Sequence, residues 1–169
     1  TSSLKPDTPN VNLGSKDVKD VTYEIVSGTS KLKVLCTFIN DNLNIIHVLE
    51  NNGTPLLTKA APTGSITQMA KNFLSNYQTY KAGTAYADLQ SSLDRISISK
   101  NSTTTVDNMQ VDVSSVDGVV TFKWTYQCNG IIAPAKFVTL SFKDNFFKAF
   151  VDNWQTYQIG STQVSISKS

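Results

Sequence analysis

The chain contains one histidine, His47, and two cysteines, Cys36 and Cys128, so few side chains can act as a general base, a thiolate nucleophile or a soft metal ligand. A catalytic histidine needs a nucleophile or an orienting carboxylate within reach, and Glu50 is the closest acid to His47 in the sequence. Zinc requires three or four ligands, which one histidine and two distant cysteines do not supply. We therefore expect no enzyme activity, no metal and no cofactor, and a structural or surface role for His47.

The two cysteines each lie on the apolar side of a predicted strand. Cys36 shares its period of two with Val34, and Cys128 shares its own with Trp124 and Tyr126, so both thiols should point into the core. In an exported protein this pair can form a disulfide, and a loop of this length would stabilise the fold by about 4 kcal/mol. The alternative is two separate buried thiols that act as small hydrophobic side chains. Sequence spacing leaves both open, because a disulfide also needs a specific separation of the Cβ atoms.

The positions of these residues depend on a strand pattern that is strongest from residue 119 to residue 157. Apolar side chains take every second position over 120–128 and again over 138–142, with turn residues between the two runs. Residues 146–154 fit both a helical and a strand period, and we favour a strand because a hairpin return costs less loop entropy. Shorter strands are predicted at 21–25, 32–39, 43–49, 96–98 and 164–166, with a mixed strand-like run over 106–116.

Ser65 begins the clearest helical pattern, because Gln68 stands in capping-box position and apolar residues follow at helical spacing up to Tyr77. Gly83 should end this helix, and Thr84 should cap a second, short one. The predicted fold class is α+β: an antiparallel β-sheet, a meander, packed against one main amphipathic helix plus a second short helix. Residues 1–19 are polar and lack an apolar period, so we assign them to an N-terminal tail and residues 20–169 to a single domain.

Composition limits the partners and the location. Charged residues make up 17% of the 169 residues, and the net charge is +2. Positive and negative residues are interspersed along the chain and form no basic stripe, which argues against a nucleic-acid partner. No apolar run is long enough for a transmembrane helix. Because charged residues are few, the surface must be rich in hydroxyl and amide groups, which favours an extracellular or cell-surface location. The sequons at Asn52 and Asn101 are candidate glycosylation sites in such an environment.

Phe146, Phe150 and Trp154 form a candidate binding patch. On a strand they project from the face opposite to Phe147, and an exposed aromatic face of this kind would bind a partner. The alternative is that the helix beginning at Ser65 covers this face, as helices packed on sheets normally do.

Several segments of the chain resemble a known group of proteins. They are residues 152–168, with Trp154-Gln155-Thr156-Tyr157 at their centre, the strand segment 122–126 with Asn129-Gly130, and the helical residues 73–80. In these segments the chain resembles uncharacterised exported archaeal proteins with PepSY-like domains. The resemblance implies an α+β domain, with a helix on an antiparallel sheet, located outside the membrane. It carries over no catalytic residues.

These observations lead to two hypotheses for the function. The first is an extracellular, non-enzymatic structural protein of the cell surface, a filament or surface-layer subunit that assembles when its N-terminal tail adds a strand to a neighbour's sheet. The alternative is a secreted PepSY-like module that binds peptides or regulates a protease, at an open sheet edge or at the aromatic patch. The expected partner is accordingly a second copy of the chain, or another surface protein or peptide.

Overall fold

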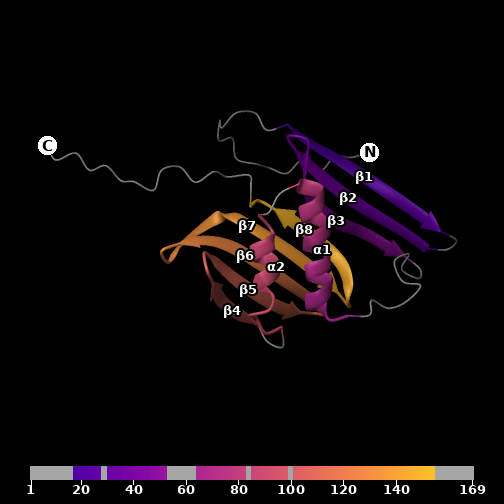
Figure 1. Cartoon of the computed structure of the whole chain (residues 1–169). Helices are drawn as coiled ribbons and strands as arrows, with labels where there is room; N and C mark the ends of the chain where they lie inside the picture. Colours follow the sequence, from indigo (N-terminus) through magenta and orange to yellow (C-terminus); the bar gives the residue numbers. More distant parts are fainter. Residues whose placement is uncertain (1–16, 28–29, 53–63, 83–84, 99–100, 155–169) are drawn as a thin grey trace.

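The computed structural model describes residues 17–27, 30–52, 64–82, 85–98 and 101–154. Within these residues the chain forms one eight-stranded antiparallel sheet and two helices (Figure 1). The strand order is β1-β2-β3-β8-β7-β6-β5-β4. The strands are β1 (Val18–Ser27), β2 (Ser30–Ile39), β3 (Asn42–Asn52), β4 (Ser102–Val106), β5 (Met109–Val116), β6 (Val119–Cys128), β7 (Ile131–Lys143) and β8 (Phe146–Asp152).

The sheet consists of two meanders rather than one. Strands β1 to β3 form the first and β4 to β8 the second, and the last strand, β8, pairs with β3 to join them. The predicted antiparallel sheet is thus confirmed, with the strands taking a larger part of the fold than the helices. β1 begins at Val18, so the last two residues of the predicted tail belong to the sheet. β8 is a strand, as the hairpin argument favoured.

Both helices lie on one face of the sheet (Figure 1). α1 (Ile66–Lys81) begins as the capping pattern predicts, with the Ser65 Oγ accepting a hydrogen bond from the Gln68 backbone N–H at 3.2 Å. It ends at Ala82, which adopts a left-handed conformation with φ of 50°. The predicted stop at Gly83 and cap at Thr84 lie outside the described residues. The second helix, α2 (Ala87–Ser92), follows Tyr86.

Cross-strand pairing separates an apolar face of the sheet from a polar one. On the helix side, one row crosses all eight strands through Ser102, Val113, Phe122, Leu140, Phe150, Ile46, Cys36 and Val21. The adjacent row on the opposite side passes through Thr103, Asp112, Lys123, Thr139, Val151, Ile45, Thr37 and Asp20. Such alternation is expected of an antiparallel sheet that is covered on one face and solvated on the other.

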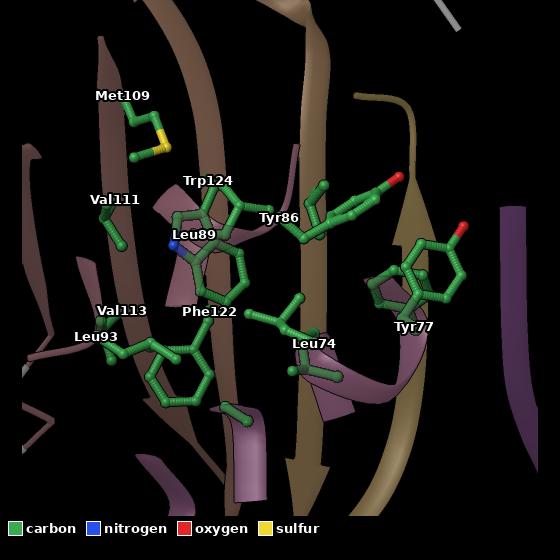
Figure 2. Close-up of a cluster of buried hydrophobic side chains, with 14 of the residues drawn as sticks. Leu74, Tyr77, Tyr86, Leu89, Leu93, Met109, Val111, Val113, Phe122 and Trp124 are labelled. Atoms are coloured by element: carbon green, nitrogen blue, oxygen red, sulfur yellow. The ribbon is translucent and has the colours of Figure 1, made fainter. Parts of the chain in front are cut away.

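The core lies between the helices and strands β4 to β8. Figure 2 shows Leu74 of α1 and Leu89 of α2 beside the buried side chains of the central strands. Trp124 of β6 is fully buried, and its indole Nε1–H donates a hydrogen bond to the Ser92 Oγ at 2.8 Å. This bond fixes α2 over β6, because a buried indole N–H needs a partner.

One local prediction was wrong. Residues 96–98 are irregular, with a bend at Ile98, rather than a strand, and the edge strand is β4, whose Ser-Thr-Thr-Thr sequence has no apolar alternation. The strand-like run over 106–116 is confirmed for β5, but a turn at Asp107, where φ is 52°, separates Val106 at the end of β4 from it. The predicted strand at 164–166 lies outside the described residues.

Candidate functional site

The outer edge of β1 is the longest open edge that the described residues offer. β1 is ten residues long and, among those residues, pairs with β2 alone. Figure 1 shows it at the border of the sheet, away from the two helices. An edge strand carries a row of backbone N–H and C=O groups to which another extended chain can bind. The edge at β1 can therefore accept an additional strand.

The side chains of β1 differ on its two faces. On the helix side Val21 and Tyr23 lie opposite Cys36 and Val34 of β2, and the Tyr23 side chain is 49% exposed. On the other side the Asp20 carboxylate accepts a hydrogen bond from the Thr37 hydroxyl at 2.7 Å. An incoming strand would thus meet one apolar and one polar face, and so would bind in a defined register.

The opposite edge of the sheet, β4, is half as long. It has five residues, and one of its threonines, Thr103, donates a hydrogen bond to the Asp112 carboxylate of β5 at 2.6 Å. Short edge strands offer few backbone groups to a neighbour, and natural proteins use them to prevent edge association. β1 is therefore the better acceptor of the two.

The junction between the two meanders contains a buried polar cluster made by Asp152, Tyr77 and Tyr86, to which we refer as the seam cluster. Within the described residues, three residue pairs join β3 to β8: Ile45 with Val151, Ile46 with Phe150, and His47 with Ala149. The Asp152 side chain, which is 1% exposed, accepts hydrogen bonds from the Tyr86 hydroxyl at 2.5 Å and from the backbone N–H of Trp154 at 2.8 Å. The seam cluster thus lies at the end of this short ladder.

Tyr77 bridges the two sides of the junction. Its hydroxyl lies 2.5 Å from the Leu43 carbonyl oxygen of β3 and 2.8 Å from the Asp152 Oδ2 of β8, and it can donate its proton to either acceptor. The Asn44 side chain of β3 donates to the Asp152 backbone carbonyl at 2.8 Å. Figure 2 shows the Tyr77 and Tyr86 hydroxyl groups at the same end of the core. These bonds join the two meanders in place of further ladder pairs.

The seam cluster favours protonated tyrosines. Burial and, after it, the Asp152 carboxylate raise the pKa of Tyr77 and of Tyr86 far above the ordinary value of 10.0. Burial lowers the pKa of the nearby Lys81, and the Asp152 carboxylate acts on it in the opposite direction. Groups that remain protonated and are enclosed in this way donate structural hydrogen bonds. The arrangement is consequently suited to holding the fold rather than to moving protons.

The structure does not bring the chemically reactive residues together. His47 is exposed on β3, on the polar side of the sheet with Leu35 and Ala149 as its cross-strand neighbours. In the described part of the chain, no group of three or more His, Cys, Asp or Glu side chains has the arrangement of a metal site.

Of the two alternatives for Cys36 and Cys128, the structure shows the second, because both thiols are free. Cys36 is buried in β2, whereas Cys128 is half-buried at the end of β6. Four strand spacings separate β2 from β6 in the sheet, or roughly 19 Å, far more than a disulfide spans. Burial raises the pKa of the Cys36 thiol, which makes it a poor nucleophile.

The two sequons lie at different kinds of position. Asn52 is the last residue of β3, and the rest of its sequon lies outside the described residues. Asn101 is exposed just before β4, and its Oδ1 accepts a hydrogen bond from the Ser115 backbone N–H at 2.7 Å. That bond uses the amide oxygen, whereas a glycan would be attached to the amide nitrogen.

The predicted aromatic patch is divided by an irregularity in the β7–β8 pairing between Ser141 and Phe142. Because of this irregularity Phe147 and Phe150 share the helix side instead of alternating, and both rings pack on Phe73 of α1, at 5.0 and 4.7 Å between centroids. Phe150 is fully buried. Phe146 is half-buried and lies opposite Lys143. The three residues therefore do not form one exposed surface.

Trp154 instead belongs to a cluster that the periodicity did not reveal. Its ring meets the Tyr126 ring edge to face at 6.1 Å, and the Lys136 ammonium lies 4.8 Å from the Tyr126 centroid and 5.5 Å from that of Trp154. Lys136 reaches both rings because β7 contains extra residues opposite Tyr126, where the β6–β7 register shifts. For the seam cluster a signal was present: Asp152 continues the inward period of Phe150, and Tyr77 lies on the apolar stripe of α1.

Comparison of the chain with models of protein families, with curated proteins and with solved structures gave no match. None of the helices in the described ranges has the length and hydropathy that a membrane-crossing helix requires.

Proposed function

We propose that this protein is an extracellular, non-enzymatic structural subunit of the cell surface, and that copies of it join by strand addition at the outer edge of β1. The observation that carries the proposal is the ten-residue edge of β1, which pairs with β2 alone among the described residues. A backbone ladder with a neighbouring chain would supply affinity, and the different side chains on the two faces of β1 would supply register.

The donor strand in this proposal is the N-terminal segment of another copy. Sixteen residues precede Asp17, which is enough to pair along all of β1. This segment directly precedes β1 in the chain, so the donor and the acceptor are neighbours in sequence. A subunit that carries its own donor beside its acceptor can form a head-to-tail chain of copies.

A surface-exposed subunit also agrees with the polar face of the sheet. Threonine, serine and lysine side chains line the side of β6 and β7 that the helices leave open, and the exposed Asn101 lies just before the edge strand β4. Glycosylation at Asn101 would extend this hydrophilic face.

The alternative proposal is a secreted PepSY-like module that binds an extended peptide. It uses the same edge, because strand addition does not depend on whether the donor is a second copy or a foreign peptide. The buried position of Phe150 removes the aromatic patch from this alternative and leaves the edge of β1 as its acceptor.

Light scattering and electron microscopy of the full chain test the main proposal. We expect assemblies that are lost when residues 1–16 are deleted, a truncation that leaves β1 intact. Tyr23→Lys on β1 should also abolish them, because a charge on an edge strand opposes pairing. Thr105→Lys on β4 is the matched control and should leave the assemblies unchanged.

A full-length chain that remains monomeric at high concentration would refute the structural subunit. If such a monomer binds extended peptides and Tyr23→Lys removes the binding, the alternative replaces it. Assemblies that persist after the deletion would exclude the N-terminal segment as the donor.

A further inference from the structure

The β6–β7 hairpin projects beyond its neighbours in the sheet. β5 pairs with β6 only as far as Tyr126, and β8 pairs with β7 only as far as Val138. Beyond one further bond, from the Gln127 N–H to the Asn108 carbonyl oxygen, the hairpin extends past both flanking strands. Figure 1 shows this end of the hairpin reaching outward from the sheet. Residues 127–136, with the turn at Asn129-Gly130, form this projection, which we call the arm.

The distal part of the arm is apolar and exposed. Ile131 is 75% exposed, the highest value among the large hydrophobic side chains that the structure describes, and Ile132 is 44% exposed. They begin a run of five apolar residues, Ile131-Ile132-Ala133-Pro134-Ala135, in which all but Ala133 are exposed. A consecutive exposed apolar run has no folding purpose and usually marks a binding surface.

The arm itself carries one charge, and it is positive. Residues 127–136 contain Lys136 and no aspartate or glutamate. Asp107, in the β4–β5 turn at the same end of the sheet, is paired with Arg95 at 3.5 Å. An apolar tip without acidic residues avoids repulsion from a negatively charged surface, and Lys136 at its base would be attracted to one.

The base of the arm has the composition of a membrane interface. Tyr126, Trp154 and Lys136 are half-buried and pack together there, with the Lys136 ammonium over both rings. Tyrosine and tryptophan favour the boundary between hydrocarbon and water, because each has an apolar ring and a polar group. A lysine at the same level extends its ammonium group towards the lipid headgroups.

From this arrangement we propose that the arm inserts into the headgroup region of an anionic lipid bilayer, with Ile131 and Ile132 among the acyl chains and Tyr126, Trp154 and Lys136 at the interface. A lipid surface fits better than a protein pocket. The tip exposes apolar side chains on both faces of a narrow hairpin, and a lysine and two aromatic rings stand behind it. This proposal is independent of strand addition, because β1 lies at the far edge of the sheet from β6 and β7.

Sedimentation of the full chain with lipid vesicles tests the proposal. We expect binding to vesicles of phosphatidylcholine mixed with phosphatidylglycerol in equal parts, and weaker binding to phosphatidylcholine alone or at high salt. Ile131→Asp should reduce binding to the anionic vesicles about tenfold or more. Lys136→Gln should reduce the preference for anionic vesicles while leaving binding to neutral ones unchanged.

Val116→Asp is the matched control. Val116 is 59% exposed at the end of β5, beside the β5–β6 turn, and this turn lies at the opposite end of β6 from the arm. The same substitution there should therefore leave vesicle binding unchanged. Both variants should keep the circular dichroism and melting temperature of the parent chain, because each replaces an exposed side chain. Tryptophan fluorescence gives a second measurement: vesicles should shift the Trp154 emission to the blue, and Trp154→Phe should remove the shift, because Trp124 is already buried.

Three outcomes would overturn the proposal: a parent chain that stays in solution with both kinds of vesicle, a folded Ile131→Asp variant that binds as the parent does, or a Val116→Asp variant that loses binding equally. Self-association in solution that Ile131→Asp abolishes, without any vesicle binding, would assign the arm to a protein interface instead.

Discussion

The two meanders of the sheet share one continuous backbone ladder but differ in what covers their helix side. Strands β4 to β8 lie under α1 and α2, and their inward side chains are mostly fully buried. Among the side chains that the structure describes in β1 to β3, only Leu43 and Ile46 of β3 pack against that core, and Tyr23 and Val26 of β1 are exposed. The five-strand meander therefore carries the stability of the fold, whereas the three-strand meander presents an edge. Substitutions of similar chemistry in the two meanders should have very different effects.

The largest effect is expected in the five-strand meander. Trp124→Ala should lower the free energy of unfolding by about 4 kcal/mol, because it removes a fully buried ring and leaves the Ser92 hydroxyl without its indole partner. Urea denaturation followed by circular dichroism measures this loss. A loss below about 1 kcal/mol would mean that the helices do not hold the core as described.

An intermediate effect is expected at the junction. Asp152→Asn keeps the shape of the side chain but removes one of the two carboxylate oxygens, and should cost about 2 kcal/mol. Asp144→Asn, on the exposed β7–β8 turn, is the matched control and should be neutral, because asparagine tolerates the positive φ found there. Equal effects of the two substitutions would remove the seam cluster from the account of stability.

The same cluster predicts a loss of stability in alkaline solution. The fold raises the pKa of Tyr77 and Tyr86 above their ordinary value of 10.0, so their contribution is complete below pH 10.0 and decreases as the pH rises above it, when the unfolded chain releases these protons. Urea denaturation on both sides of pH 10.0 measures this decrease.

The Tyr77→Phe, Tyr86→Phe double variant should be less stable at neutral pH and less sensitive to alkali than the parent. Tyr80→Phe, at an exposed position of α1, should keep the sensitivity of the parent chain. An unchanged alkaline slope in the double variant would contradict the assignment.

The smallest effect is expected in the three-strand meander. Tyr23→Ala on β1 should change the free energy of unfolding by no more than about 0.5 kcal/mol, because its ring is 49% exposed and lies outside the core. Thermal melting of the dilute chain measures it. A loss as large as that of Trp124→Ala would show that the two meanders do not differ in the way proposed.

Sequence reasoning located most of the strands because alternation is a local property. Phe122 and Trp124 are inward as their period requires, and Ser65 caps α1 as its spacing with Gln68 predicts. β4 was missed because its threonines carry no apolar alternation and its position is set by pairing with β5. The divided aromatic patch was missed for a related reason: one irregular pair shifts every later side chain to the other face, and a period of two cannot reveal it.

Tertiary position was the harder part to predict. The inward orientation of Cys36 followed from alternation, but its distance from Cys128 depended on two meanders being joined through β3 and β8. The seam cluster likewise brings together Tyr77 of α1, Tyr86 just before α2 and Asp152 of β8. Nothing in the sequence around Tyr86 indicates that its hydroxyl is hydrogen-bonded to Asp152. The pairing of strands that are distant in sequence determines which residues meet in the fold, and local patterns carry no information about that pairing.

The junction between β3 and β8 also affects how the chain reaches its native state. Asn44 and Asp152, which are hydrogen-bonded there, stand 108 residues apart in sequence. During synthesis β3 emerges long before β8. For that interval the edge of β3 that pairs with β8 in the folded protein has no partner strand. We expect the nascent first meander to depend on chaperones or rapid translation, since unpaired strands of this kind associate with one another. Refolding of the full chain should be slower than that of a simple hairpin meander, because the β3–β8 pairing joins residues that are far apart in sequence.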